Sequence, residues 1–125
     1  ANDPALADDP AVAEYRTAMT DLGFPADGDF ATAAAGWTGA ELTVEVLKAA
    51  AASDEGLTRA SIMNAARAID HQFQLARDGV RFTLNGAEDA FGLESLQVVQ
   101  YDADSKTYTD IGELVTTFEG KTELP

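Results

Sequence analysis

The sequence predicts an α/β fold in which helices come first, short strands follow, and the sheet is incomplete. Up to about residue 70, apolar side chains recur every three or four positions, the period of helices that pack on one face. After Gly79 apolar and polar residues alternate, as in half-buried strands. No complete βαβ unit precedes Gly79, so the chain supplies less sheet than its helices could cover. We therefore expect it to be part of something larger.

The first predicted helix begins at a capping residue. Asp9 is suited to accept hydrogen bonds from the free N–H groups of the first turn, and Pro10 at the first helical position loses nothing by lacking an N–H. Gly23 is suited to the left-handed position that ends many helices. The apolar stripe between them consists of Val12, Tyr15, Met19 and Leu22.

A longer helix is predicted from Phe30 or Gly36 to Ala52. Its apolar stripe consists of Trp37, Val44, Leu47 and Ala51, and its polar side of Glu41, Glu45 and Lys48. Gly36 and Gly39 are costly inside a helix, so we expect the entry near Trp37 to be irregular or packed close to another backbone.

Thr58 caps a third predicted helix, which should run to about Asp70. Leu57 and Ile62 have the spacing of a hydrophobic staple across that cap. The apolar stripe consists of Ile62, Ala65, Ala66 and Ile69.

Three short strands are predicted after Gly79. They cover residues 80–84, 96–101 and 108–111, and residues 102–107 form a hairpin loop between the last two. The stretch from residue 115 to 125 has weak periodicity, which indicates a tail or a short edge element.

Length and charge restrict the classes of function. With 125 residues and 13.2 kDa the chain is expected to be a single segment over 1–125. Twenty-two acidic against eight basic side chains give a net charge of −14, which disfavours nucleic acid and anionic membranes as partners. The absence of cysteine excludes disulfides, thiolate metal sites and cysteine nucleophiles.

Residues that could carry catalysis are few. His71 is the only histidine, no Gly-x-Ser-x-Gly elbow accompanies it, and its position after the third predicted helix is typical of a surface or capping residue. The acidic run from Asp102 to Glu113 has oxygen ligands at four positions of a calcium loop, but Lys106 and Thr107 stand where a ligand and a glycine are needed. A hairpin loop explains that run better.

Several short segments follow one another along the chain in a recognisable order. They are Asp9-Pro10 and the helix after it, residues 34–42 (Ala-Ala-Gly-Trp-Thr-Gly-Ala-Glu-Leu), 46–50, 57–62 (Leu-Thr-Arg-Ala-Ser-Ile), 79–82 and 98–101. In this order they resemble the type I solute-binding proteins of ABC transporters, the leucine/isoleucine/valine-binding group. Trp37 and Gly39 depart from the family's usual Tyr and Ala.

This resemblance implies the C-terminal part of a two-lobed type I periplasmic-binding-protein fold. It implies uptake of a small solute such as a branched-chain amino acid, an amide or an aromatic acid, with no enzymatic activity and no cofactor. The partners would be the solute and a membrane permease, and the location extracytoplasmic, with a lipid anchor as one form. The missing lobe leads us to expect that the chain dimerises or pairs with an absent N-terminal part.

The resemblance also places the ligand near Phe30, Thr32 and Trp37. The N–H groups of a helix start and the Thr32 hydroxyl could hold a carboxylate, while Phe30 or Trp37 covers the apolar portion of the ligand. The competing hypothesis is an acidic protein–protein interaction domain without a small-molecule ligand.

Overall fold

The computed structural model describes residues 6–25, 31–86 and 88–116. Within these ranges it contains three helices followed by two antiparallel two-stranded sheets, which confirms the predicted mixed α/β class. The elements are α1 (Pro10–Asp21), α2 (Ala31–Ala51), α3 (Arg59–Arg67), β1 (Asp70–Gln72), β2 (Arg81–Thr83), β3 (Leu96–Asp102) and β4 (Thr107–Val115).

The first helix forms as its sequence predicts. The Asp9 carboxylate accepts hydrogen bonds from the backbone N–H groups of Ala11 at 2.8 Å and Val12 at 3.2 Å. After the helix, Gly23 takes a φ of +90°, a conformation open to glycine at little cost. Both ends of α1 are therefore set by local sequence.

Helix α2 runs without a break through Gly36 and Gly39, so the predicted irregular entry near Trp37 is wrong. A Cβ at either glycine would meet nothing within 4 Å, which shows that neither glycine serves a close backbone contact. Thr38 and Thr43 donate their hydroxyls to carbonyls four residues earlier, at 2.9 and 2.8 Å. These bonds keep the hydroxyls satisfied on the helix surface.

The third helix is shorter than predicted. Thr58 caps it, and its side chain and that of Ser61 form a reciprocal capping box. The helix ends at Arg67 rather than near Asp70, because Asp70–Gln72 pairs as β1 with Arg81–Thr83. Arg81 Nε donates to Asp70 Oδ1 across this pair at 2.7 Å.

Strands β3 and β4 form a ribbon joined by the predicted hairpin loop. Asp102 Oδ1 accepts from the backbone N–H groups of Asp104 and Ser105, each at 2.9 Å, and Lys106 takes a φ of 58°. The pairing is regular from Asp102 back to Val98, and a register shift separates Val98 from Leu96. Asp102 thus closes a turn.

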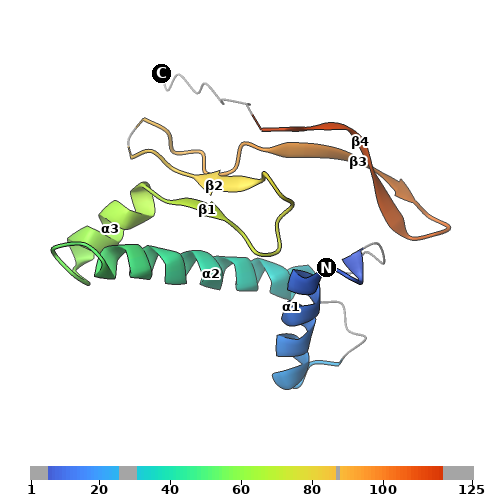
Figure 1. Ribbon diagram of the computed structural model, residues 1–125, viewed down its shortest axis with the longest axis horizontal. Coiled ribbons are helices and arrows are strands. Elements are labelled where there is room, and N and C mark those ends of the chain that lie inside the picture. The colour runs from blue at the N-terminus through green and yellow to red at the C-terminus, as the bar shows by residue number, and fades with distance from the viewer. Residues whose placement is uncertain (1–5, 26–30, 87, 117–125) are drawn as a thin grey trace.

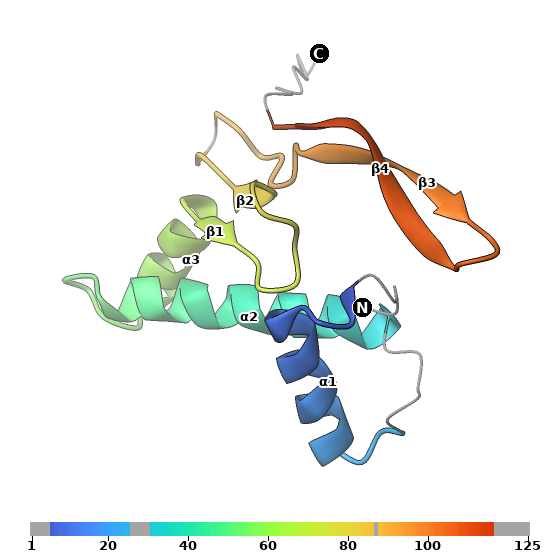
Figure 2. The same ribbon diagram turned by 45° about the vertical axis from the view of Figure 1, so that its right-hand side comes forward.

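Figures 1 and 2 show α2 along one side of β1 and β2, with α1 crossing near the start of α2 and the β3–β4 ribbon on the far side of the small sheet. The principal core is small: Tyr15 and Met19 are buried against Trp37, Leu75 and two alanines of α2. The ribbon, in contrast, leaves large apolar side chains half exposed, among them Leu96, Val98, Tyr101, Tyr108 and Ile111. Within the described ranges, no helix is long and apolar enough to cross a bilayer.

Candidate functional site

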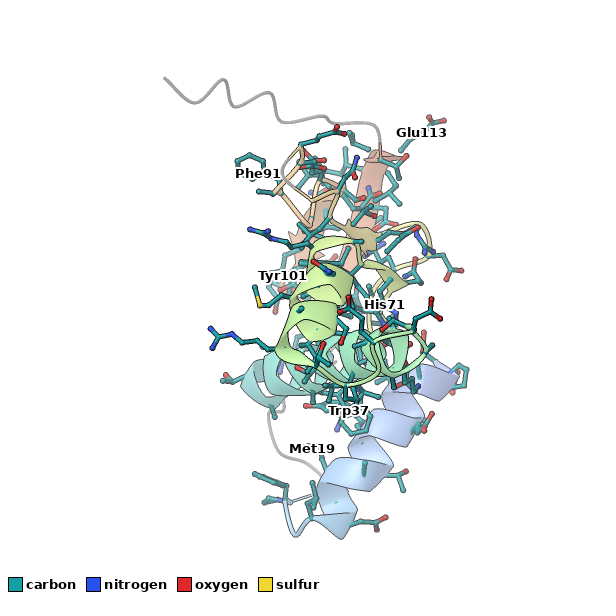
Figure 3. The ribbon with its side chains drawn as sticks, turned by 90° about the vertical axis from the view of Figure 1, so that its left-hand side faces the viewer. Met19, Trp37, His71, Phe91, Tyr101 and Glu113 are labelled. Atoms are coloured by element: carbon teal, nitrogen blue, oxygen red, sulfur yellow. The ribbon has the colours of Figure 1, made fainter. Side chains whose placement is uncertain are left out.

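The least exposed ion pair among the described residues joins Glu41 of α2 to His71 of β1. His71 Nε2 and Glu41 Oε1 are 2.8 Å apart, and each side chain is 18% exposed. A carboxylate only accepts hydrogen bonds, so an ionised Glu41 fixes the hydrogen on Nε2 and leaves Nδ1 as the acceptor of a neutral imidazole. Figure 3 shows His71 beside α3 and Trp37 next to α1.

Gln74, in the loop after β1, links this pair to the first helix. Its backbone N–H donates to the same Glu41 Oε1 at 2.9 Å, and its side-chain amide donates to Glu14 at 2.7 Å. The Gln74 Oε1 accepts from the indole N–H of Trp37 at 3.3 Å. His71 and the loop after β1 therefore hold the Glu41 carboxylate in place, and Glu14 of α1 holds that loop through Gln74.

His71 lies at the wall of a pocket of about 730 Å³ between α2, α3 and β1. Asp70 and Glu45 line this pocket as well. The hydrogen bond from Arg81 lowers the pKa of the Asp70 carboxyl, and the hydrogen bond from Lys48 lowers the pKa of the Glu45 carboxyl. Both carboxyls are thus charged at neutral pH. Asn64 and Lys48 line the same pocket and carry N–H donors.

A smaller pocket of about 330 Å³ lies along α2 and is bordered by Trp37, Glu41, Val44 and Gln74 among others. Glu41 lines this pocket and His71 lines the larger one. The carboxylate and the imidazole that it holds therefore stand between two concave surfaces.

The three residues predicted from the sequence to bind a ligand have different positions. Trp37 borders the smaller pocket, packed edge-on against Tyr15 with ring centroids 5.4 Å apart. Thr32 is exposed in the first turn of α2 and is not among the residues that line either of these two pockets. Phe30 lies outside the described residues. A ligand role for all three stays a prediction.

From the sequence, His71 is a candidate for catalysis that is interpreted as a surface or capping residue at a helix end. Glu41 is placed on the polar side of its helix, and Gln74 is not considered. The spacing of Trp37, Glu41 and Val44 places them on one helix face, a signal that could have brought Glu41 into the site. Nothing in the sequence pairs Glu41 with His71, thirty positions later.

Within the part of the chain that the structure describes, no group of three His, Cys, Asp or Glu side chains could hold a metal ion. The contact between Glu41 and His71 has the geometry of an acid–base pair, in which the carboxylate orients the imidazole.

Comparisons with known proteins give a family match and no individual relative. No curated protein and no solved structure matches the chain. The family model of peptidase family M28 matches residues 37–116, a span that contains Glu41, His71 and Gln74.

This match overturns the predicted solute-binding protein of an ABC transporter. With it fall the predicted uptake function, the expectation of no enzymatic activity and the assignment to a type I periplasmic-binding-protein fold. The acidic interaction domain finds no support either. The segments behind the resemblance are helix caps, turns and strand ends, which local backbone geometry favours in many unrelated folds. Because the family model covers well over half of the sequence, the chain belongs to peptidase family M28.

Proposed function

We propose that this chain serves peptide-bond hydrolysis, with His71 as general base and Glu41 as the residue that orients it. The observation that carries the proposal is the 2.8 Å contact between His71 Nε2 and Glu41 Oε1, inside the span that matches the peptidase family and at the wall of a 730 Å³ pocket. A histidine held by a carboxylate through one ring nitrogen is suited to take a proton through the other.

The proposed step uses a water molecule as nucleophile. His71 Nδ1 takes a proton from the water as its oxygen bonds to the carbonyl carbon of the peptide, and Glu41 stabilises the imidazolium that results. The same proton then passes to the amide nitrogen as the C–N bond breaks, which leaves a carboxylic acid and an amine. Asn64 and Lys48 line this pocket and are suited to donate to the carbonyl oxygen as it becomes negative.

The test is peptide hydrolysis by the intact protein, followed on a mixture of internally quenched peptides. Removal of a general base costs about 10²- to 10⁴-fold, so we expect His71→Ala to lower kcat by at least a hundredfold. On peptides without lysine or arginine, Glu41→Gln should lower kcat less and leave KM nearly unchanged, because Glu41 acts through His71.

The matched control is Glu113→Gln, which removes one carboxylate charge from the ribbon, well away from His71 (Figure 3). It should hydrolyse the peptides at the wild-type rate. The absence of hydrolysis in the wild type, or wild-type hydrolysis by a folded His71→Ala variant, would overturn the proposal.

A further inference from the structure

The lining of the smaller pocket combines apolar side chains with a few polar groups. Trp37, Ala40 and Val44 supply the apolar wall, and Glu41, Glu45 and Gln74 supply polar groups. Residues 37, 40, 41, 44, 45 and 48 follow the helical spacing of three and four, so a single face of α2 forms most of the surface. At about 330 Å³ the pocket is at the small end of ligand sites, which fits a side chain or a small molecule.

One oxygen of the Glu41 carboxylate has no hydrogen-bond donor among the described residues. Glu41 Oε1 accepts from both His71 and Gln74, whereas Glu41 Oε2 is buried and has no partner among the described residues. A buried carboxylate oxygen without a donor loses its hydration with nothing in return, which costs free energy. Because Glu41 also lines the pocket, a small rotation of its carboxyl group would offer this oxygen to a donor bound there.

The charges around the pocket indicate whether a bound ligand is cationic or anionic. Glu41 and Glu45 both line the pocket, and the chain carries a net charge of −14. The one basic side chain among the lining residues, Lys48, lies 2.6 Å from Glu45 Oε1, so its ammonium is paired there. An anionic ligand is therefore disfavoured and a cationic one is favoured.

From this geometry we infer that the pocket of Trp37 and Glu41 binds a primary ammonium or guanidinium group on a short aliphatic stem. The stem lies against Trp37 and Val44, and the cation meets the Glu41 carboxylate. Aromatic ring faces attract cations, and lysine and arginine side chains bury their methylenes while keeping the charge at a polar partner. The binding of a cation in this pocket does not depend on the proposed function. The further step, that the cation is a lysine or arginine side chain of a peptide, rests on the proposed function.

Trp37 makes the binding measurable without hydrolysis. It is the only tryptophan in the chain, so intrinsic fluorescence of the intact protein reports on this pocket. Titration with butylammonium and with butylguanidinium should give a saturable change in the spectrum. Butanol has the same stem and no charge. It should give no change in the spectrum at concentrations up to ten times that at which the butylammonium response is half complete. Equal responses to butanol and butylammonium would overturn the inference.

Two variants test the roles of the carboxylate and of the pocket. Glu41→Gln should weaken butylammonium binding by about tenfold or more, as expected for the loss of a hydrogen bond to a charged group, and Glu113→Gln should not. Because Glu41→Gln also alters the His71 contact, Ala40→Leu provides a second variant, which fills the pocket and leaves Glu41 intact. Wild-type affinity in both Glu41→Gln and Ala40→Leu would contradict the site.

The source of the cation is decided by two end-blocked tripeptides that differ only in a central lysine or norleucine. Tighter binding of the lysine peptide than of butylammonium, with no binding of the norleucine peptide, supports a peptide side chain as occupant. Binding of butylammonium without binding of the lysine peptide overturns the peptide assignment. Hydrolysis of uncharged peptides is measured separately, so failure of cation binding and failure of the proposed function are distinguishable.

Discussion

Trp37 and Gln74 lie 37 positions apart, yet the indole Nε1 of Trp37 donates a hydrogen bond of 3.3 Å to the side-chain oxygen of Gln74. Gln74 in turn donates its backbone N–H to Glu41 and its side-chain amide to Glu14. The loop after β1 is thereby attached to both α1 and α2. The stability of this junction and the orientation of His71 therefore depend on the same residue, through its side chain and its backbone N–H respectively.

Replacement of Trp37 by Phe tests the junction. The ring contact with Tyr15 is largely kept and the N–H donor is lost, so the free energy of unfolding should fall by about 1 kcal/mol. Urea denaturation followed by circular dichroism measures it. Trp37→Ala, which also removes the ring, should cost about 3 kcal/mol. Equal losses in the two variants would show that the Gln74 contact carries the whole effect and the ring none.

Replacement of Gly92 should be costly, because a Cβ there would overlap the ring of Phe82, which packs against Phe73. We expect Gly92→Ala to lower the free energy of unfolding by about 1–3 kcal/mol, the usual cost of overpacking. Gly36→Ala is the matched control: Gly36 lies in α2 with open space around it, so alanine should stabilise the helix by about 0.5–1 kcal/mol. Thermal melts should show a lower melting temperature for Gly92→Ala and a higher one for Gly36→Ala. A lower melting temperature for Gly36→Ala would contradict the open space around Gly36.

The turn of the β3–β4 ribbon should weaken in acid. Hydrogen bonds from the backbone N–H groups of Ser105 and Asp104 lower the pKa of Asp102 below its ordinary 3.8. A carboxyl with a lowered pKa in the folded state stabilises the turn fully above pH 3.8 and loses that effect as the pH falls through the lowered value. Hydrogen exchange of the Asp104 and Ser105 amides should therefore accelerate, relative to the intrinsic rate, only below pH 3.8. In Asp102→Asn this dependence should be absent.

Self-association remains a prediction, and the structure suggests which surface to test. Val98 and Ile111 are paired across the ribbon, and each is about half exposed, at 53% and 50%. Burial of such side chains against a second copy would remove apolar area from water, while the net charge of −14 opposes it. We expect the mass from light scattering to rise with protein concentration, and more so at about 0.5 M salt, where repulsion is screened.

Paired threonine substitutions test that surface. Val98→Thr with Ile111→Thr keeps the β-branched shape and should leave a monomer under the same conditions. Leu57→Thr is the control, because Leu57 is 62% exposed beside α3 rather than on the ribbon. A wild-type chain that is monomeric at every concentration and salt would contradict the prediction.

The features predicted correctly are those that neighbouring residues determine. Asp9 and Thr58 cap their helices through bonds to the next few backbone N–H groups, and Asp102 closes a turn of six residues, so the local sequence contains the whole interaction. Strand β1 was missed because Asp70–Gln72 becomes a strand only through its pairing with Arg81–Thr83. The Glu41–His71 contact was missed for the same reason, since a helix side chain and a strand side chain meet only after folding. The family was misassigned because caps and turns recur across folds.

The register shift in the ribbon has a consequence for how the protein behaves when concentrated. Within the described residues, β3 and β4 have no further strand beside them, so their outer edges offer backbone groups to other chains. Continuous, regular edges of this kind support fibril growth, in which each added chain pairs in the same register. Here Gly112, with a φ of +72°, lies where the pairing of β4 with β3 loses its regular register. An irregularity of this sort twists the strand and limits the edge available to an incoming chain to the stretch near the turn.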